Sequence, residues 1–201
     1  MMNNKNTIVV ATTNKGKVRE IKNILNEVFP NAEFKSLDEL NCNIDVEEDK
    51  DTFAGNATKK AKELSNYFEL PCISDDSGLC IDEYDGWPGV KTARFLGENK
   101  TDRERNIYIL DKMNGLQKER RKAKCTTSIA FSEKGKETIV VEAYIDGYIA
   151  DTLRGENGFG YDEIFEVEGV TLAEMKPEEK NEISARKKAL ILMREKIATS
   201  I

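Results

Sequence analysis

Apolar residues recur along this chain at two periods, and the two periods predict strands and helices that alternate. The β-branched run Thr7–Ala11 predicts a buried strand. The spacing of three and four residues that follows is typical of a helix, which Pro30 should end. That helix carries its apolar residues at Val18, Ile21, Ile24, Leu25 and Val28.

A second helix is predicted after the acidic segment Asp45–Asp51. Thr52 is its expected N-cap, because a threonine hydroxyl can accept a hydrogen bond from an N–H group of the first turn. The apolar face of this helix consists of Phe53, Ala57, Ala61, Leu64 and Phe68.

Strand-like runs dominate the middle of the chain. Pro71–Ser74 leads into a short strand, and Gly78–Asp82 is either its continuation or its partner. Lys124–Ser132 and Glu137–Ile149 predict two longer strands with a turn at Lys134-Gly135-Lys136 between them. A paired set of strands within a strand–helix alternation predicts an α/β fold with a mixed sheet.

Two further helices and a loop complete the expected elements. Asp102–Met113 predicts a polar helix, and Ala185–Ile197 predicts the closing helix with Ser184 as its cap. The glycine-rich stretch Gly155–Gly160 predicts a loop. Because no repeat, low-complexity tract or linker interrupts the pattern, we expect residues 1–201 to form a single domain.

Charge and composition narrow the function. The chain has 201 residues, a formal net charge of −6 and no histidine. Nucleic-acid and membrane-surface binding need concentrated positive charge, so neither is expected. The lack of histidine excludes Ser-His-Asp and Cys-His nucleophiles and histidine zinc sites. Acid–base chemistry must therefore come from carboxylates, lysine, tyrosine or metal-bound water.

The cysteines and the first residues bear on the cellular compartment. The four cysteines show no C-x-x-C spacing and do not indicate a disulfide scaffold at this length. The segment Met1–Thr7 is short and polar, without the apolar stretch of a signal peptide, and no apolar run is long enough to span a bilayer. A cytoplasmic protein is the simplest interpretation.

The segment Thr12–Lys17, between the first strand and the first helix, is the first candidate site. Free N–H groups at a helix N-terminus favour anions, Gly16 allows close approach, and Lys15 and Lys17 add positive charge. The segment is not a Walker A loop, because it lacks the first glycine and Val18 follows the lysine. The alternative interpretation is a polar turn with solvated lysines.

The second candidate is the carboxylate pair Asp75 and Asp76, within Ser74-Asp75-Asp76-Ser77-Gly78. Adjacent carboxylates at the end of a buried strand are costly unless a cation or hydrogen bonds compensate them. Magnesium prefers carboxylate, phosphate and water oxygens, and a carboxylate nearby could take the proton of an attacking water. The alternative is an ordinary turn, since Asp, Ser and Gly are turn residues.

The third candidate is the segment Asn157–Asp162. Phe159 stands between two glycines, which permits an exposed aromatic ring that could stack on a flat base. Alternatively, Phe159 and Tyr161 are core anchors beneath a loop.

Two groups of charges have open interpretations. Glu47-Glu48-Asp49 is either a solvated loop or the source of a metal ligand. Lys180 and Arg186 flank Ser184 near the start of the last helix and are ordinary surface charges unless a site uses them.

Six short patterns, taken together and in order, are more specific than any one of them. They read T-x-N-x-G-K, F-x-x-N-A-x-x-K-A, D-D-S-G, P-G-V…A-R, G-F-G-Y-D and E-E-K-x-x-I-S-x-R. This set, from Thr12 to Arg186, resembles the ITPase family. Its members, also called XTP/dITP pyrophosphatases, remove inosine and xanthosine triphosphates from the nucleotide pool.

The resemblance implies roles for the phosphate-binding and metal-binding residues. Asp76 matches the family's proton acceptor and metal-site residue, with Asp75 beside it, and Glu47 or Glu48 matches a second acidic contact to Mg²⁺. The substrate loop is implied at Thr12, Thr13, Asn14, Lys15, Gly16 and Lys17.

Further substrate contacts are implied by the remaining patterns. The hallmark helix is matched by Phe53, Asn56, Ala57, Lys60 and Ala61, of which Lys60 is expected to reach the phosphates. Other contacts are implied at Ser77, Phe159, Gly160, Tyr161, Asp162, Lys180 and Arg186. Those from Phe159 onward concern the base and sugar.

The family fold is an elongated α/β protein with a mixed sheet flanked by helices and a cleft between two lobes, usually a homodimer. This chain departs from the family at three positions. Thr13 and Glu163 stand where the family commonly has glycine and proline, and Ala185 stands where it has the histidine beside the purine. The missing histidine at Ala185 predicts a difference in base selectivity rather than in phosphate chemistry.

We therefore expect a magnesium-dependent pyrophosphatase for purine nucleoside triphosphates such as ITP, dITP and XTP. In the expected mechanism, a water activated by Asp76 and magnesium attacks the α-phosphorus, while Lys15, Lys17 and backbone amides stabilise the developing charge. Two alternatives are a nucleotide-binding regulator without turnover and a Maf-like pyrophosphatase that acts on other nucleotides.

Overall fold

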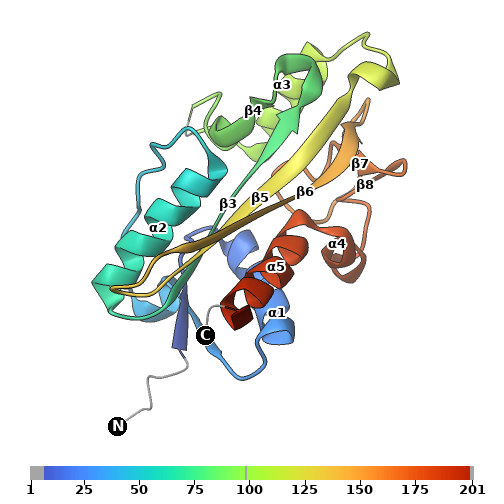
Figure 1. Cartoon of the computed structure of the whole chain (residues 1–201). Helices are drawn as coiled ribbons and strands as arrows, with labels where there is room; N and C mark the ends of the chain where they lie inside the picture. Colours follow the sequence, from blue (N-terminus) through green and yellow to red (C-terminus); the bar gives the residue numbers. More distant parts are fainter. Residues whose placement is uncertain (1–6, 98, 200–201) are drawn as a thin grey trace. The chain divides into compact units, whose positions relative to one another are not determined.

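The computed structural model describes residues 7–97 and 99–199, which form an eight-stranded sheet with flanking helices (Figure 1). This architecture confirms the predicted α/β fold with a mixed sheet. The elements are β1 (Thr7–Val10), α1 (Lys15–Val28), β2 (Glu33–Ser36), α2 (Phe53–Phe68), β3 (Cys72–Ile81), β4 (Trp87–Pro88), α3 (Asp102–Lys112), β5 (Lys122–Ser132), β6 (Ile139–Ile149), β7 (Phe165–Val167), β8 (Val170–Thr171), α4 (Pro177–Ile183) and α5 (Ala185–Thr199), with short 3₁₀ turns at Asp38–Leu40, Asp82–Tyr84, Gly89–Lys91 and Lys118–Arg120.

The strand order is β2-β1-β3-β5-β6-β7-β8, and β4 pairs with β3. The pairs β1–β2 and β1–β3 are parallel, whereas β3–β4, β6–β7 and β7–β8 are antiparallel. Parallel neighbours need a crossover, which α1 and α2 supply. The sheet is therefore mixed because helices connect its first strands and short turns connect its last ones.

The chain divides into two compact units. Unit 1 comprises Met1–Asp76, Thr127–Ala143 and Arg186–Ile201, and unit 2 comprises Ser77–Thr126 and Tyr144–Ala185. Three strands, β3, β5 and β6, contribute residues to both units, so neither unit is one continuous stretch of chain. The single domain expected for residues 1–201 stays a prediction.

In unit 1 both faces of the sheet are covered. Val10 and Ile73 pack in one cluster with apolar residues of α1 and α5. The preceding residues on the same strands, Val9 and Cys72, point the other way and pack with Leu64 of α2. Successive side chains of a strand alternate between faces, so helices on both sides require an unbroken apolar run such as Thr7–Ala11.

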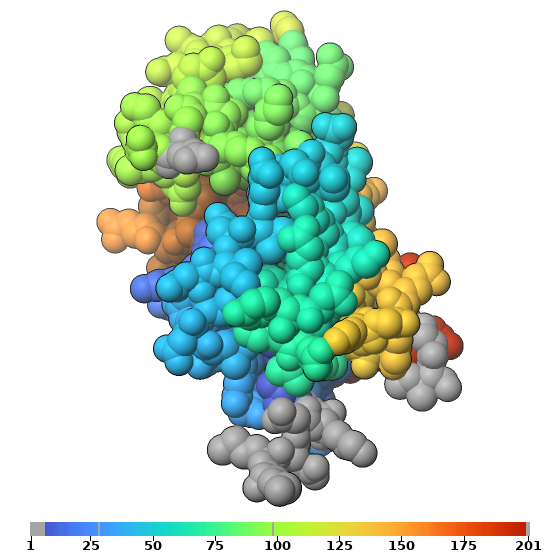
Figure 2. Space-filling view, turned by 90° about the vertical axis from the view of Figure 1, so that its left-hand side faces the viewer, coloured from blue at the N-terminus to red at the C-terminus, as the bar shows by residue number. Residues whose placement is uncertain are grey.

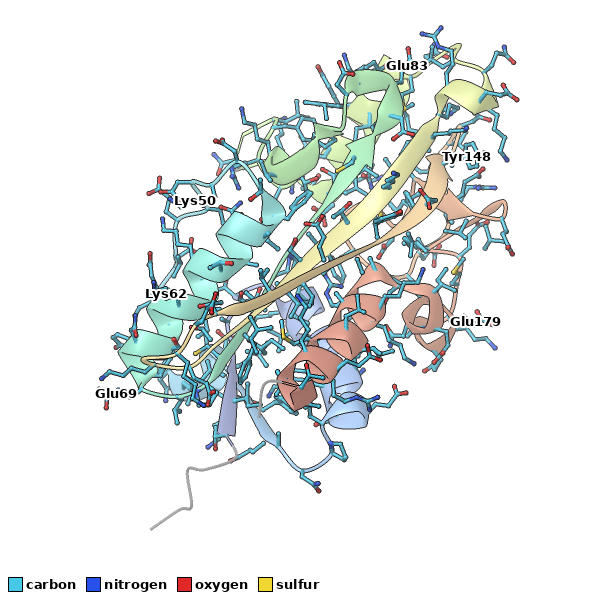
Figure 3. All side chains as sticks on the ribbon, in the orientation of Figure 1. Lys50, Lys62, Glu69, Glu83, Tyr148 and Glu179 are labelled. Carbon is cyan, nitrogen blue, oxygen red and sulfur yellow. The ribbon has the colours of Figure 1, made fainter. Side chains whose placement is uncertain are left out.

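Helix α2 begins as predicted. Thr52 is its N-cap, and the Thr52 hydroxyl accepts a hydrogen bond from the Gly55 N–H at 3.0 Å. Figure 2 shows α2 and the chain that leads into it side by side on one surface of unit 1. Lys62 lies on the solvent side of the helix (Figure 3), opposite the buried residues Ala57 and Ala61. The amphipathic pattern thus decides which side of α2 faces the sheet.

Unit 2 has a single large apolar cluster. Leu79 of β3, Ile145 and Ile149 of β6 and Ile109 of α3 belong to it. On β6 the residues on either side of Ile145, Tyr144 and Asp146, are exposed, so this part of the strand has one apolar face and one solvated face. The polar helix predicted here is α3, which a Thr101–Glu104 capping box begins.

The structure also contains elements that the pattern did not predict. The strands β2, β4, β7 and β8 span two to four residues, too few for a periodicity to be recognised. Helix α4 was likewise unexpected, and Ser184, the expected cap of the last helix, is the C-cap of α4. The turn at 134–136 and the loop at 155–160 are confirmed.

Within residues 7–97 and 99–199, the structure contains no helix that combines the length and the apolar character needed to cross a bilayer. The predicted lack of a signal peptide concerns residues 1–6 almost entirely, and these lie outside the described residues.

Candidate active site

The segment Thr12–Lys17 includes the N-terminus of α1. The Asn14 side chain is the N-cap and accepts a hydrogen bond from the Lys17 N–H at 3.1 Å. Thr12 in turn accepts from the Asn14 N–H at 3.3 Å. Lys15 and Gly16 lie in the first helical turn rather than in a loop. This arrangement is suited to anions, because the first N–H groups of a 14-residue helix point out of its end.

Asp75 and Asp76 do not lie at a strand end or in a turn, as the sequence suggested. Both lie in the middle of β3, which continues from Cys72 to Ile81. In an extended strand, adjacent side chains point to opposite faces. The Asp76 carboxylate accordingly contacts α2, whereas the Asp75 carboxylate contacts residues of α1 and α5. The two carboxylates therefore contact different helices, while the charges of Lys17 and Lys60 act on both.

Asp76 is buried beside the hallmark residues of α2. The Asn56 amide donates to the Asp76 carboxylate at 3.0 Å, and the Asn56 oxygen accepts from the Lys50 N–H at 2.9 Å. Burial raises the pKa of Asp76 from 3.8 to about 6, against the opposing charges of Lys60 and Lys17. A carboxyl group with this pKa is ionised at neutral pH and can still accept a proton.

Lys60 connects the surroundings of Asp76 to the acidic segment. Its ammonium donates to the Glu48 carboxylate and to the Asp75 backbone carbonyl, both at 2.7 Å. Burial alone would lower the pKa of Lys60, but the negative charges of Asp75, Asp76 and Glu48 outweigh burial and raise it. Lys60 is therefore a fixed positive charge among three carboxylates.

The Asp75 carboxylate lies in a buried ion cluster on the other face of β3. Arg186 donates to it at 3.0 Å, and the Lys17 ammonium lies 3.3 Å away. Arg186 also forms an ion pair with Glu20 of α1. Arg186 is only 7% exposed, so the interpretation as an ordinary surface charge is wrong. Its described contacts tie α5 to α1 and β3.

The predicted metal ligands differ in their positions. Glu47 is exposed, and its backbone carbonyl accepts from Lys59. Glu48 is half-buried and its charge acts on Asp76. A small cavity of about 60 Å³ is lined by Thr12, Thr13, Ala11, Leu37, Ile44, Asp45, Val46, Glu48, Lys60 and Leu64. Two residues of the predicted substrate loop, Thr12 and Thr13, therefore meet Glu48 and Lys60 at one place in unit 1.

The few acidic residues near Asp76 suit a magnesium ion better than a metal ion whose ligands all come from the protein. Within the described part of the chain, no three acidic or cysteine side chains group as a metal site. Magnesium needs only one or two carboxylates when phosphates and water complete its shell. Asp76 and Glu48 are the pair that the described contacts favour, since both interact with Lys60.

In unit 2 the Asp162 carboxylate organises the predicted base-binding segment. One of its oxygens accepts from the Phe159 N–H at 2.8 Å and from the Lys180 ammonium at 2.6 Å. The ammonium also lies 4.8 Å from the centre of the Phe159 ring. Lys180 is 8% exposed, so it too is no ordinary surface charge. Phe159, Asp162 and Lys180 thus form one connected group.

The other predicted residues of this segment have structural contacts. Tyr161 packs against the apolar cluster of unit 2 and donates its hydroxyl to the Thr92 carbonyl, as expected for a core anchor. Burial raises the pKa of Tyr161. Ser77 is half-buried on β3, and Ala185, at the family's histidine position, is buried in the same apolar cluster.

Sequence reasoning did not find two residues that hold Gly160. The Asp102 carboxylate accepts from the Gly160 N–H at 2.8 Å, and the Asn106 amide donates to the Gly160 carbonyl at 3.0 Å. Both come from α3, more than fifty residues earlier. A polar helix with a good capping box gave no signal that two of its side chains reach a distant loop.

Known proteins resemble this chain over nearly its full length. Residues 8–196 match the family model described as the Ham1 family. The chain is 45% identical over 185 residues to the dITP/XTP pyrophosphatase of Geobacillus kaustophilus, covering 91% of this chain and 90% of that protein. For the dITP/XTP pyrophosphatase of Bacillus subtilis, the identity is 43% over 184 residues, covering 90% and 92%.

Solved structures show the same fold. The Staphylococcus aureus Ham1 protein is similar with a TM-score of 0.85 and 35% identity, covering 97% of this chain and 100% of that chain. A nucleoside-triphosphatase / dITP/XTP pyrophosphatase from Mycobacterium abscessus has a TM-score of 0.74 and 35% identity, covering 93% and 98%.

Proposed function

The chain belongs to the Ham1 family, and from this premise we infer that it is a hydrolase of non-standard purine nucleoside triphosphates. Its substrates are ITP, dITP and XTP, and its products are the nucleoside monophosphate and pyrophosphate. The observation that carries this function is the buried Asp76 carboxylate, oriented by Asn56 and surrounded by Lys60 and Glu48.

The residues of unit 1 support the phosphate chemistry. Asp76 is the proposed general base, because its raised pKa lets it accept a proton from the attacking water. Lys60 and Lys17, together with the N–H groups at the start of α1, stabilise negative charge on the phosphates. Asp76 and Glu48 would hold Mg²⁺, which when bound neutralises phosphate charge.

The residues of unit 2 support base binding. Phe159 offers a ring for stacking, and Lys180 and Asp162 hold the segment that carries it. Arg186 of unit 1 is a further proposed base contact, as the resemblance implies. Its ion pairs with Glu20 and Asp75 also support a role in holding α5 against α1 and β3.

The assembly and location are proposals that rest on the resemblance. We propose a homodimer in the cytoplasm that acts on free nucleotides and not on nucleic acid. Light scattering of the purified protein measures the oligomeric state, and a mass equal to one chain would contradict the dimer.

A single assay tests the function. Pyrophosphate release is measured with ITP, XTP, dITP, ATP and GTP, with magnesium and in excess chelator. We expect release from the first three in magnesium and none in chelator. Undiminished hydrolysis in chelator would exclude the metal. The absence of release from every substrate would indicate a regulator, and a preference for pyrimidine triphosphates would indicate a Maf-like enzyme.

A further inference from the structure

Side chains of helix α3 form hydrogen bonds with both backbone polar groups of Gly160, the residue that follows Phe159. The Asp102 carboxylate accepts from the Gly160 N–H at 2.8 Å, which belongs to the peptide bond between Phe159 and Gly160. The Asn106 amide donates to the Gly160 carbonyl at 3.0 Å, which belongs to the next peptide bond. Two adjacent peptide planes are therefore fixed by one helix.

Phe159 is also fixed on its other side. Its own N–H donates to the Asp162 carboxylate at 2.8 Å, and Lys180 donates to the same oxygen. The peptide bonds before and after Phe159 are thus both held by carboxylates, Asp162 and Asp102. The direction of the Phe159 Cα–Cβ bond follows from these two planes, because Cα lies between them.

The contacts of α3 are made by residues at helical spacing. Asp102, Arg105 and Asn106 lie three and four positions apart and share one side of the helix. Arg105 donates to the second oxygen of Asp102 at 3.0 Å, which leaves the first oxygen directed at Gly160. Asn106 also donates to the Glu163 carboxylate at 3.2 Å, and Glu163 accepts from Arg103 at 3.0 Å.

Stability does not explain these polar residues. Asn106 is fully buried, and Arg105 is 9% exposed. Among residues 7–97 and 99–199, the Asn106 Oδ1 and Arg105 Nη1 atoms have no hydrogen-bond partner in the protein. A buried polar atom without a partner costs about 1–3 kcal/mol.

We propose that Asp102 and Asn106 are positioning residues that set the Phe159 ring for stacking on the purine before the nucleotide binds. The proposal rests on the proposed function, since it concerns the base-binding half of that substrate. A pre-ordered loop improves binding because the nucleotide does not have to order it. The base, and not the phosphates, is the part of the ligand that should sense the loss of these contacts.

The test separates the two products of the proposed reaction, one with a base and one without. Inhibition constants of IMP and of pyrophosphate are measured against ITP hydrolysis for wild type, Asp102→Ala, Asn106→Ala and Asp102→Asn. We expect the IMP constant to rise roughly 3- to 10-fold in each alanine variant, the scale of one lost hydrogen bond. The pyrophosphate constant and kcat should change by less than about 2-fold.

Two controls distinguish positioning from a general loss of structure. Asp102→Asn keeps one acceptor oxygen and loses the one that Arg105 uses. An amide turned with its oxygen towards the Gly160 N–H should give an IMP constant between those of wild type and Asp102→Ala. Asp111→Ala removes a carboxylate from an exposed position at the other end of α3 and should leave both constants unchanged. A smaller folded fraction lowers the apparent kcat but leaves both constants as they were.

Several results would overturn the proposal. Unchanged IMP constants in both alanine variants would do so, as would equal increases for IMP and pyrophosphate. If Asn106→Ala does not fold, Asp102→Ala decides alone, because the Asp102 side chain is 49% exposed and tolerates truncation. Failure of the proposed function is distinct, since wild type would then form no IMP from ITP.

Discussion

In unit 1 the charged residues of the site contact one another through their side chains. In unit 2 the loop around Phe159 is instead fixed by hydrogen bonds to its backbone. Asp76 contacts Asn56, and Asp75 contacts Arg186 and Lys17. In unit 2 the backbone groups of Phe159 and Gly160 receive the contacts instead. The first arrangement places charges, and the second places a ring.

This difference predicts which kinetic quantity each unit controls. Charge placed near the phosphates stabilises the transition state, so substitutions in unit 1 should lower kcat. A ring placed for stacking contributes to binding in the ground state and the transition state alike, so substitutions in unit 2 should raise KM. Variants in each unit test whether unit 1 controls kcat and unit 2 controls KM.

The largest effect is expected for Asp76→Asn. An amide cannot accept the proton of the attacking water, so kcat for ITP should fall by roughly 10²-fold or more. The Asn56 contact can persist, since asparagine keeps an acceptor oxygen. Steady-state kinetics measures the loss, and turnover within a few-fold of wild type would remove Asp76 from the role of general base.

The stability of Asp76→Asn tests whether its lower kcat comes from the missing carboxylate or from a less stable fold. The folded-state pKa of Asp76 is raised from 3.8 to about 6, so protonation favours the folded state. The stabilisation by this proton is complete below pH 3.8 and is lost as the pH rises through about 6. At neutral pH the buried charge destabilises the metal-free fold by up to about 3 kcal/mol. Asp76→Asn should therefore unfold at higher denaturant than wild type at pH 7.5 without metal.

The second largest effect is expected in the pH dependence of kcat. Because the base acts in its ionised form, kcat should fall as the pH drops through the pKa of Asp76, about tenfold for each unit below it. Bound magnesium favours the carboxylate, so the midpoint in the loaded enzyme should lie at or below about 6. Activity measured from pH 4.5 to 8 in a constant-ionic-strength buffer checks this, and a flat profile would contradict it.

A smaller effect is expected for Gly158→Ala in unit 2. A Cβ atom at Gly158 would meet the Asp162 carboxylate oxygen at 2.0 Å, so the contacts of Asp162 with Phe159 and Lys180 must change. Loss of charged hydrogen bonds of this kind should raise KM for ITP roughly tenfold while kcat stays near wild type.

Gly169→Ala is the matched control for backbone strain. Gly169 has a φ of +85°, close to the +81° of Gly158, but a Cβ there meets nothing within 4 Å. Both variants should lose stability, and only Gly158→Ala should raise KM. Equal KM values would show that the Asp162 contact does not matter for binding.

The smallest effect is expected for Arg103→Ala. Its ion pair with Glu163 spans 3.0 Å, but the Arg103 side chain is 65% exposed. Exposed ion pairs contribute about 0–1 kcal/mol, so KM for ITP should rise by less than about 5-fold. A larger increase, measured beside Asp102→Ala, would show that Glu163 is a main support of the loop and not an accessory one.

The sequence by itself was sufficient for the features that local chemistry controls. The period of apolar residues predicted β1, α1 and α2, and the hydroxyl of Thr52 predicted where α2 begins. The order of short patterns predicted the family that the comparisons confirm. Spacing and capping depend on residues within a few positions of each other, so they can be read along the chain.

Tertiary structure decided the surroundings of each charge. Asp, Ser and Gly favour turns, yet pairing keeps residues 74–78 extended inside β3, and the pleat then sends Asp75 and Asp76 to opposite faces. Arg186 meets Asp75 across 111 positions, and Asp102 meets Gly160 across 58. Such contacts depend on how helices pack against the sheet, which no local pattern encodes.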